Sequence, residues 1–126
     1  MNNRDHQICE KLLTEIAVID DLLKGFSLEN FQCDERTVRA VCMTLINIGE
    51  LVKNLTPELR NAHREVPWRA ISGMRDVTAH KYQTLRREDV YRTCIDDIPD
   101  FKNKILQLLT GTTSGSCPVA GSDGLQ

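Results

Sequence analysis

Apolar residues recur every three or four positions along most of this chain, which is the spacing of one face of an α-helix. The clearest pattern lies between residue 34 and about residue 55, and its members are Val38, Val41, Cys42, Leu45, Ile48, Gly49, Val52 and Leu55. An earlier stretch over residues 4–24 carries Ile8, Leu12, Ile16, Ile19 and Leu23 with the same spacing. No stretch of useful length alternates with the period of two that strands show. The pattern therefore predicts an all-α fold.

Capping residues predict where the first helix ends and the second begins. Gly25 tolerates the left-handed backbone geometry that often ends a helix, so the first helix should stop there. Residues 26–33 are then expected to form a connecting loop. Asp34 is a typical N-cap and should begin the second helix.

Prolines divide the second half of the chain. Thr56-Pro57-Glu58 places a cap, a proline at the first helical position and an acid in the first turn, which predicts a short helix. Pro67 repeats the signal and predicts a helix from Trp68 to about His80. A last helical stretch should begin near Arg87, and Pro99 must kink it or split it because proline lacks a backbone N–H.

These elements predict a small up-and-down bundle of four to five helices with short connections. The chain has 126 residues, which is the usual size of one domain. We expect residues 1–110 to form the helical domain. Residues 111–126 hold four of the seven glycines and little periodicity, so they are expected to form a flexible tail.

Cysteine usage and hydropathy suggest the compartment. The five cysteines are scattered, odd in number and without any Cys-x-x-Cys pair, which argues against a disulfide framework and against a zinc site. No apolar run approaches the roughly 18 residues that a membrane span needs, and the N-terminus lacks the apolar core of a signal peptide. We expect a cytoplasmic protein without a membrane partner. Cys9, Cys42 and Cys94 lie on or beside the apolar faces and should be core residues, whereas Cys117 lies in the tail.

Positive charge is concentrated in one part of the chain. The sequence has a net charge of −2, yet residues 60–92 hold eight Lys and Arg against four Asp and Glu. This segment therefore carries +4 and the remainder −6. Such an excess predicts either an anionic partner or a solvated helix surface whose charges are paired with neighbours.

Catalytic groups are few, and the best candidates lie within this basic segment. Arg75 and His80 are separated by five residues, which on a helix is about 140° of rotation and about 7.5 Å of rise, so they would flank a groove. Alternatively, Arg75 pairs with Asp76 or another acid and His80 caps the helix end. His63 and Glu65 could be offered as a metal pair, but two ligands without a third favour a solvated loop, and no metal site is predicted.

The segment Val66-Pro-Trp-Arg-Ala-Ile-Ser-Gly-Met-Arg-Asp-Val-Thr-Ala-His-Lys-Tyr82 resembles the signature of the HepT-like toxins, which are ribonucleases of the HEPN superfamily. Those proteins carry R-x4-H-x-Y with a polar residue after the arginine, and Arg75, Asp76, His80 and Tyr82 match this motif. Further similarity lies in Ile46-Asn-Ile-Gly-Glu-Leu51 and in Asp96-Asp-Ile-Pro-Asp-Phe101. The resemblance extends over roughly residues 4–110 and leaves out the tail.

The resemblance implies a metal-independent RNase toxin that needs no cofactor, formed by a homodimer whose two motifs share one cleft. It implies Arg75 and His80 as the catalytic residues, while Asp76 either orients one of them or is only a salt-bridge partner. It also implies a nucleotidyltransferase antitoxin that transfers AMP to Tyr82. The alternative function is a catalytically inactive bundle that serves as the binding partner of such a nucleotidyltransferase.

Three other residues have both a structural and a functional interpretation. Gly49 could support the cleft or permit close helix packing, and Glu50 could support the cleft or bind a neighbouring backbone group or arginine. Trp68 could stack on a base, although an anchor in the core is the preferred interpretation.

Overall fold

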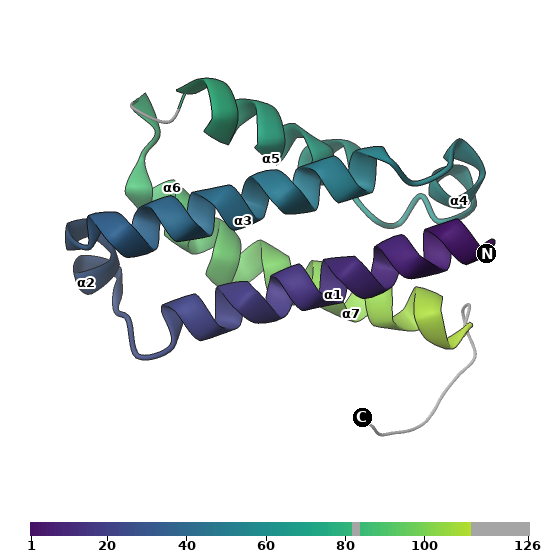
Figure 1. Ribbon diagram of the computed structural model, residues 1–126, viewed down its shortest axis with the longest axis horizontal. Coiled ribbons are helices and arrows are strands. Elements are labelled where there is room, and N and C mark those ends of the chain that lie inside the picture. Colours follow the sequence, from purple (N-terminus) through teal and green to yellow (C-terminus); the bar gives the residue numbers. More distant parts are fainter. Residues whose placement is uncertain (82–83, 112–126) are drawn as a thin grey trace.

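The computed structural model describes residues 1–81 and 84–111, with the side chains of residues 77–81 outside the description, and these ranges contain no strand (Figure 1). The four helices longer than ten residues in these ranges are α1 (Asn3–Leu23), α3 (Glu35–Lys53), α5 (Trp68–Lys81) and α7 (Ile98–Thr110). Successive long helices run in opposite directions, with α3 packed against both α1 and α5, and α7 against α1. The predicted all-α bundle is confirmed.

The segment predicted as a loop after the first helix contains a short helix, α2 (Leu28–Cys33). It begins at Ser27, whose hydroxyl accepts a hydrogen bond from the backbone N–H of Asn30 at 3.1 Å. Phe31 is fully buried, and its ring lies 5.5 Å from that of Tyr91. The loop prediction was wrong. An N-cap and one buried aromatic residue are sufficient to fix about one and a half turns of helix here.

The predicted caps of α3 and of α4 (Pro57–Ala62) are confirmed. Asp34 Oδ1 accepts from the N–H of Thr37 at 3.1 Å, and the Thr56 hydroxyl accepts from the N–H of Leu59 at 3.3 Å. Thr56 is itself fixed by Asp5 of α1, whose carboxylate accepts from the Thr56 N–H at 3.1 Å and from its hydroxyl at 2.6 Å. Asp5 is only 1% exposed, so this buried contact ties the start of α4 to α1.

The last helical stretch is split before Pro99, as the sequence predicts. It consists of α6 (Arg87–Arg92), a π-helical turn η2 (Thr93–Asp97) and α7, with Pro99 in the first turn of α7. A π-helical turn uses i→i+5 hydrogen bonds and so changes the phase of the apolar face. Ile95 lies in this turn and is 49% exposed, whereas Cys94 and Ile98 of the same stretch are buried.

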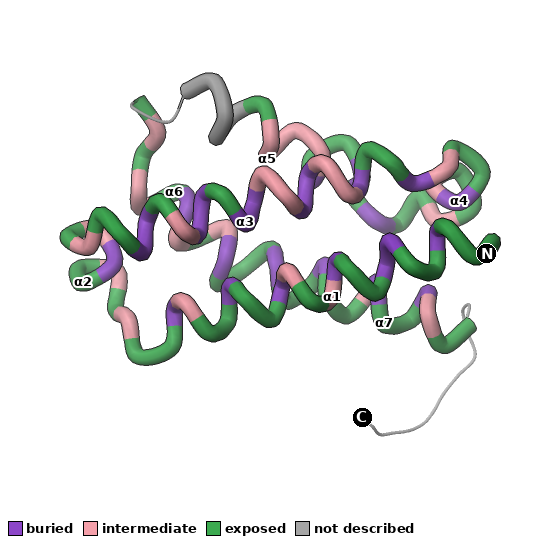
Figure 2. The backbone as a smooth tube through the Cα atoms, in the orientation of Figure 1, coloured by how far each residue is buried: buried purple, intermediate pink, exposed green. Residues whose placement is uncertain are grey.

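The core runs along the inward sides of the four long helices (Figure 2). Cys9, Cys42 and Cys94 belong to it, as predicted, and burial raises the pKa of the Cys9 thiol to about 11 and that of Cys94 to about 12. Burial also raises the pKa of Cys42. These three thiols therefore stay protonated and unreactive at neutral pH. Cys117 and the rest of the predicted tail from residue 112 lie outside the described residues.

None of the described helices combines the length and the apolar character that crossing a membrane requires.

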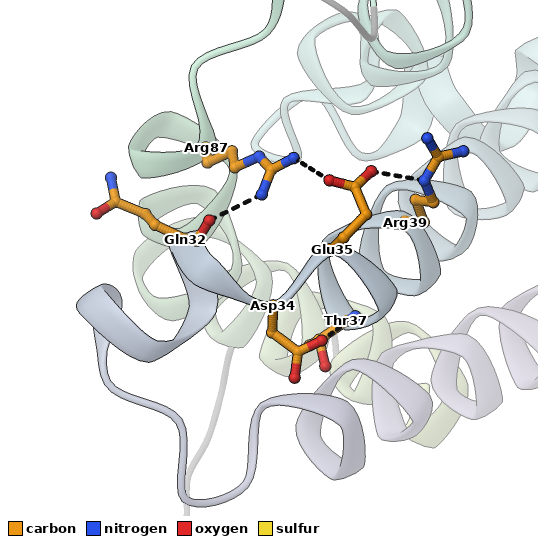
Figure 3. A network of polar contacts seen from close by, with 6 residues as sticks. All are labelled: Gln32, Asp34, Glu35, Thr37, Arg39 and Arg87. Carbon is orange, nitrogen blue, oxygen red and sulfur yellow. Dashed lines mark hydrogen bonds and ion pairs between the residues drawn. The ribbon is translucent and has the colours of Figure 1, made fainter.

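A polar network joins α6 to the turn between α2 and α3 (Figure 3). Arg87 donates from Nη1 to the backbone oxygen of Gln32 at 2.7 Å and forms an ion pair with Glu35, which also accepts from Arg39 at 2.6 Å. This network uses Arg87 to hold two parts of the fold together, so Arg87 serves the structure.

Candidate active site on α5

The candidate site is built where α3 crosses α5 at closest approach. Gly49 of α3 lies directly against Arg75 of α5: a Cβ atom added at Gly49 would lie 2.8 Å from Arg75 Cβ and 3.0 Å from its backbone nitrogen. Any side chain at residue 49 would therefore push the two helices apart. The close-packing interpretation of Gly49 is supported.

Two carboxylates hold the Arg75 guanidinium. Its Nε donates to Glu50 Oε2 at 2.8 Å, and its Nη1 donates to Asp76 Oδ1 at 2.5 Å. The Arg75 side chain is 31% exposed, that of Glu50 46% and that of Asp76 63%. Glu50 thus binds an arginine, one of the roles the sequence left open for it, and Asp76 contacts Arg75. Glu50 was not among the predicted catalytic residues. The sequence feature that could have identified it is its position directly after Gly49, the residue at which α3 approaches α5.

The other two motif residues are described less fully. Position 80 lies on α5, which continues without interruption from Arg75 to Lys81, so the five-residue offset between Arg75 and His80 is that of a helix. The His80 side chain and the whole of Tyr82 lie outside the described residues.

The basic segment divides into two groups of arginines. Arg86, Arg87 and Arg92 each pair with a carboxylate of the fold, as Arg75 does. By contrast, three arginines nearer to the start of α5 form no ion pair with any carboxylate of the described residues. These are Arg60, Arg64 and Arg69. The interpretation as charges paired with neighbours therefore holds for one part of the segment. For the other part, the anionic partner remains a prediction.

The loop before α5 is ordered by contacts within the fold. His63 Nδ1 lies 3.5 Å from Glu65 Oε2, and the His63 backbone oxygen accepts from Trp68 Nε1 at 2.9 Å. The Trp68 ring is buried and meets Phe101 of α7 edge to face at 6.2 Å between centroids. Trp68 is thus a core anchor, as preferred. Within the described part of the chain, no three His, Cys, Asp or Glu side chains gather as a metal site would require.

Chemically, the site offers a fixed, permanently charged guanidinium on a helix that also carries a histidine one and a half turns further on. A guanidinium can bind a phosphate through two parallel hydrogen bonds, and an imidazole can accept or donate a proton near neutral pH. This pair of groups suits chemistry at a phosphodiester.

The chain is similar to proteins that are described as ribonucleases. The family described as "Ribonuclease HepT-like" matches residues 12–108. A candidate RNase of Caldanaerobacter subterraneus subsp. tengcongensis is 36% identical over 100 residues, which cover 79% of this chain and 89% of that protein. The probable ribonuclease HepT of Thermococcus cleftensis is 33% identical over 99 residues, covering 79% and 90% of the two chains. No solved structure matches the chain.

Proposed function

This chain belongs to the HepT-like ribonuclease family, and we propose that it is a metal-independent endoribonuclease in which Arg75 and His80 carry out the reaction. The observation that supports this most directly is the position of Arg75, clamped by Glu50 and Asp76 on the helix that also bears His80. A clamped arginine is prepared to bind one scissile phosphate in a fixed orientation.

Arg75 holds the phosphate. Glu50 is the less exposed of its two acidic partners and fixes the guanidinium from α3 through Nε. Asp76 is the more exposed partner and contacts Nη1, the end of the side chain, so an RNA phosphate would replace it there. In this proposal Glu50 positions Arg75 throughout and Asp76 holds Nη1 until RNA binds, while Arg75 stabilises the negative charge that develops on the phosphate in the transition state.

His80 moves the protons. The ribose 2′-hydroxyl gives its proton to an imidazole, and the 2′-oxygen forms a bond to phosphorus. The bond from phosphorus to the 5′-oxygen breaks, and this oxygen receives a proton as it leaves. The products are a 2′,3′-cyclic phosphate and a 5′-hydroxyl, and neither step requires a metal ion.

We propose that the active species is a symmetric homodimer. The Arg75 side of α5 supplies one wall of a groove, and a second copy would supply the other. Exposed apolar side chains of the bundle, among them Met43 at 56%, are available for such a contact. Light scattering at micromolar concentration should then give twice the mass of the chain, and a monomer would exclude the shared cleft.

The reaction itself can be tested with purified protein and single-stranded RNA in the presence of excess EDTA. We expect cleavage to continue at the same rate as without the chelator, and mass spectrometry of the fragments should show 2′,3′-cyclic phosphate ends. Loss of cleavage in EDTA with recovery on adding a divalent ion would contradict the proposed chemistry. Absence of cleavage in any buffer would favour the inactive-bundle alternative.

We further propose that the protein is the toxin of a toxin–antitoxin pair whose antitoxin is a minimal nucleotidyltransferase acting on Tyr82. In this reaction the Tyr82 oxygen would form a bond to the α-phosphorus of ATP, and pyrophosphate would leave. The added adenylyl group would bring bulk and negative charge two residues after His80, where it would repel the RNA backbone.

A Tyr82→Phe variant should separate modification from folding, because it retains the ring and removes the only oxygen that could accept the nucleotide. Incubated with the nucleotidyltransferase and ATP, the wild-type chain should gain the mass of one adenylyl group and the variant should gain none. Tyr91→Phe is the matched control and should still be modified. A variant at Tyr82 that still gains this mass would show that the modified residue lies elsewhere.

A further inference from the structure

A groove of about 540 Å³ lies beside the start of α5, on the surface formed by α4, the loop after it and the first turns of α5. Its polar lining comes from Arg60, Asn61, Arg64, Arg69 and Ser72. Arg64 and Arg69 are exposed, while Arg60 is partly buried. None of the described residues that line this groove is acidic.

The charges of these three arginines, Arg60, Arg64 and Arg69, are not neutralised within the described part of the fold. The two acidic residues nearest in sequence do not pair with these arginines. Glu65 contacts His63, and Glu58 lines a different pocket at the N-terminal end of α1. The groove also lies at the N-terminal end of the 14-residue helix α5, where the helix dipole adds positive potential. Three like charges held in one concave surface cost free energy unless an anion binds there.

Contacts with the core and with α7 support the groove. Trp68 is buried against Phe101 and donates to the His63 backbone oxygen, so the base of the groove is part of the core. From α7, Lys104 Nζ donates to the Glu65 backbone oxygen at 3.2 Å and holds the loop from outside. A preformed surface of this kind binds a ligand without first having to become ordered.

The groove is in line with the candidate site along α5. On an ideal helix, positions 69, 76 and 80 lie within about 40° of one another around the axis, and position 80 lies about 16 Å beyond position 69, whereas position 75 lies about 120° away from position 69. Asp76 lies on this line, but its carboxylate is paired with Arg75. A strand that followed this face of α5 would therefore meet the arginines of the groove first and the position of His80 a few nucleotides later.

We propose that this arginine groove, lined by Arg60, Arg64 and Arg69, binds the phosphate backbone of single-stranded RNA several nucleotides away from the bond that is cut. The proposal rests on the proposed ribonuclease function. Guanidinium groups bind phosphates through paired hydrogen bonds, and Asn61 and Ser72 add neutral donors that suit ribose and phosphate oxygens. The arrangement favours RNA over a protein partner because three of the groove's lining residues are arginines and none is acidic, which suits the repeated negative charge of a nucleic-acid backbone.

The test compares two double variants that remove equal charge. Arg64→Gln/Arg69→Gln removes the two exposed arginines of the groove, and Arg36→Gln/Lys102→Gln removes two exposed cations outside it. Binding is measured by fluorescence anisotropy with a labelled 2′-O-methyl RNA of about 24 nucleotides, long enough to span more than one contact region. This RNA lacks the attacking hydroxyl, so binding is read whether or not the protein cuts RNA. The melting temperature of the control pair should equal that of the wild type, and that of the groove variant should be equal or higher, because repulsion among the arginines is relieved.

The groove variant should lose about 1.4 units from the slope of log K against log salt, which corresponds to roughly 25-fold weaker binding at about 0.1 M salt. The control pair should change both quantities much less. With cleavable substrates, the groove variant should raise KM for the long RNA and leave cleavage of the dinucleotide UpA unchanged, since the single phosphate of UpA is the one that Arg75 would hold. Equal binding by the two double variants would overturn the proposal and assign the arginines to an acidic protein partner.

Discussion

Replacing His80 by alanine should abolish RNA cleavage, because positioned proton transfer contributes about 10²–10⁴-fold to a rate. The loss should appear in kcat, since the imidazole acts on the reacting oxygens and contributes little to binding. His6→Ala is the matched control: His6 is an exposed histidine on the first turn of α1 and should leave the rate unchanged. Both variants should bind 2′-O-methyl RNA like the wild type. Cleavage by His80→Ala at the wild-type rate would refute the role of His80 in proton transfer.

Arg75 extends this prediction to the phosphate. Arg75→Ala should reduce kcat nearly as much as His80→Ala, because the charge that develops in the transition state loses its partner. Arg75→Lys should restore little activity, since a point charge cannot make the two parallel hydrogen bonds of a guanidinium. Arg36→Ala, a change at an exposed arginine on α3, should have no effect. Full activity of Arg75→Lys would mean that charge alone suffices and that the clamp by Glu50 and Asp76 has no role in orientation.

Local signals in the sequence predicted most of the fold because they act over a few residues. Asp34 and Thr56 cap helices as expected, and Gly25 has a φ of 80°, the left-handed geometry that ends α1. The short helix α2 was missed because its stability comes from Phe31 packing on Tyr91, a contact between residues far apart in sequence.

The candidate site was predicted only in part, because some of its features are local in the sequence and others depend on contacts between distant residues. The spacing of Arg75 and His80 on one helix is a local property and could be derived from the sequence. The contact from Glu50 to Arg75 joins α3 to α5, and the sequence could only offer it as one of several options. The division of the arginines into paired and unpaired groups depends entirely on the tertiary arrangement, and the groove at the start of α5 could not be derived without it.

Gly49 connects the packing of the bundle to the geometry of the site. Its missing side chain lets α3 approach α5 so closely that Glu50, the next residue, reaches Arg75 Nε at 2.8 Å. A larger residue at 49 would meet Arg75 Cβ and the backbone oxygen of Ser72, which would lie 3.2 Å from the new Cβ. Because the neighbours are a Cβ and backbone atoms, they cannot move aside as the end of a flexible side chain could.

Gly49→Val should therefore destabilise the fold and impair the site together. Overpacking typically costs about 1–3 kcal/mol. The two methyl groups that valine adds beyond the Cβ place this change at the upper end of the range. The better helix propensity of valine offsets only part of the roughly 1 kcal/mol by which glycine disfavours a helix. We expect the free energy of unfolding to fall by about 2–3 kcal/mol, or Tm by roughly 10 °C. Gly73→Val is the control: Gly73 lies in α5 with nothing within 4 Å of an added Cβ, so its stability should stay near that of the wild type. Cleavage measured well below Tm should fall for Gly49→Val and not for Gly73→Val, because only the first change displaces Arg75. Equal stability and activity of the two variants would show that the close approach of α3 to α5 does not set the position of Arg75.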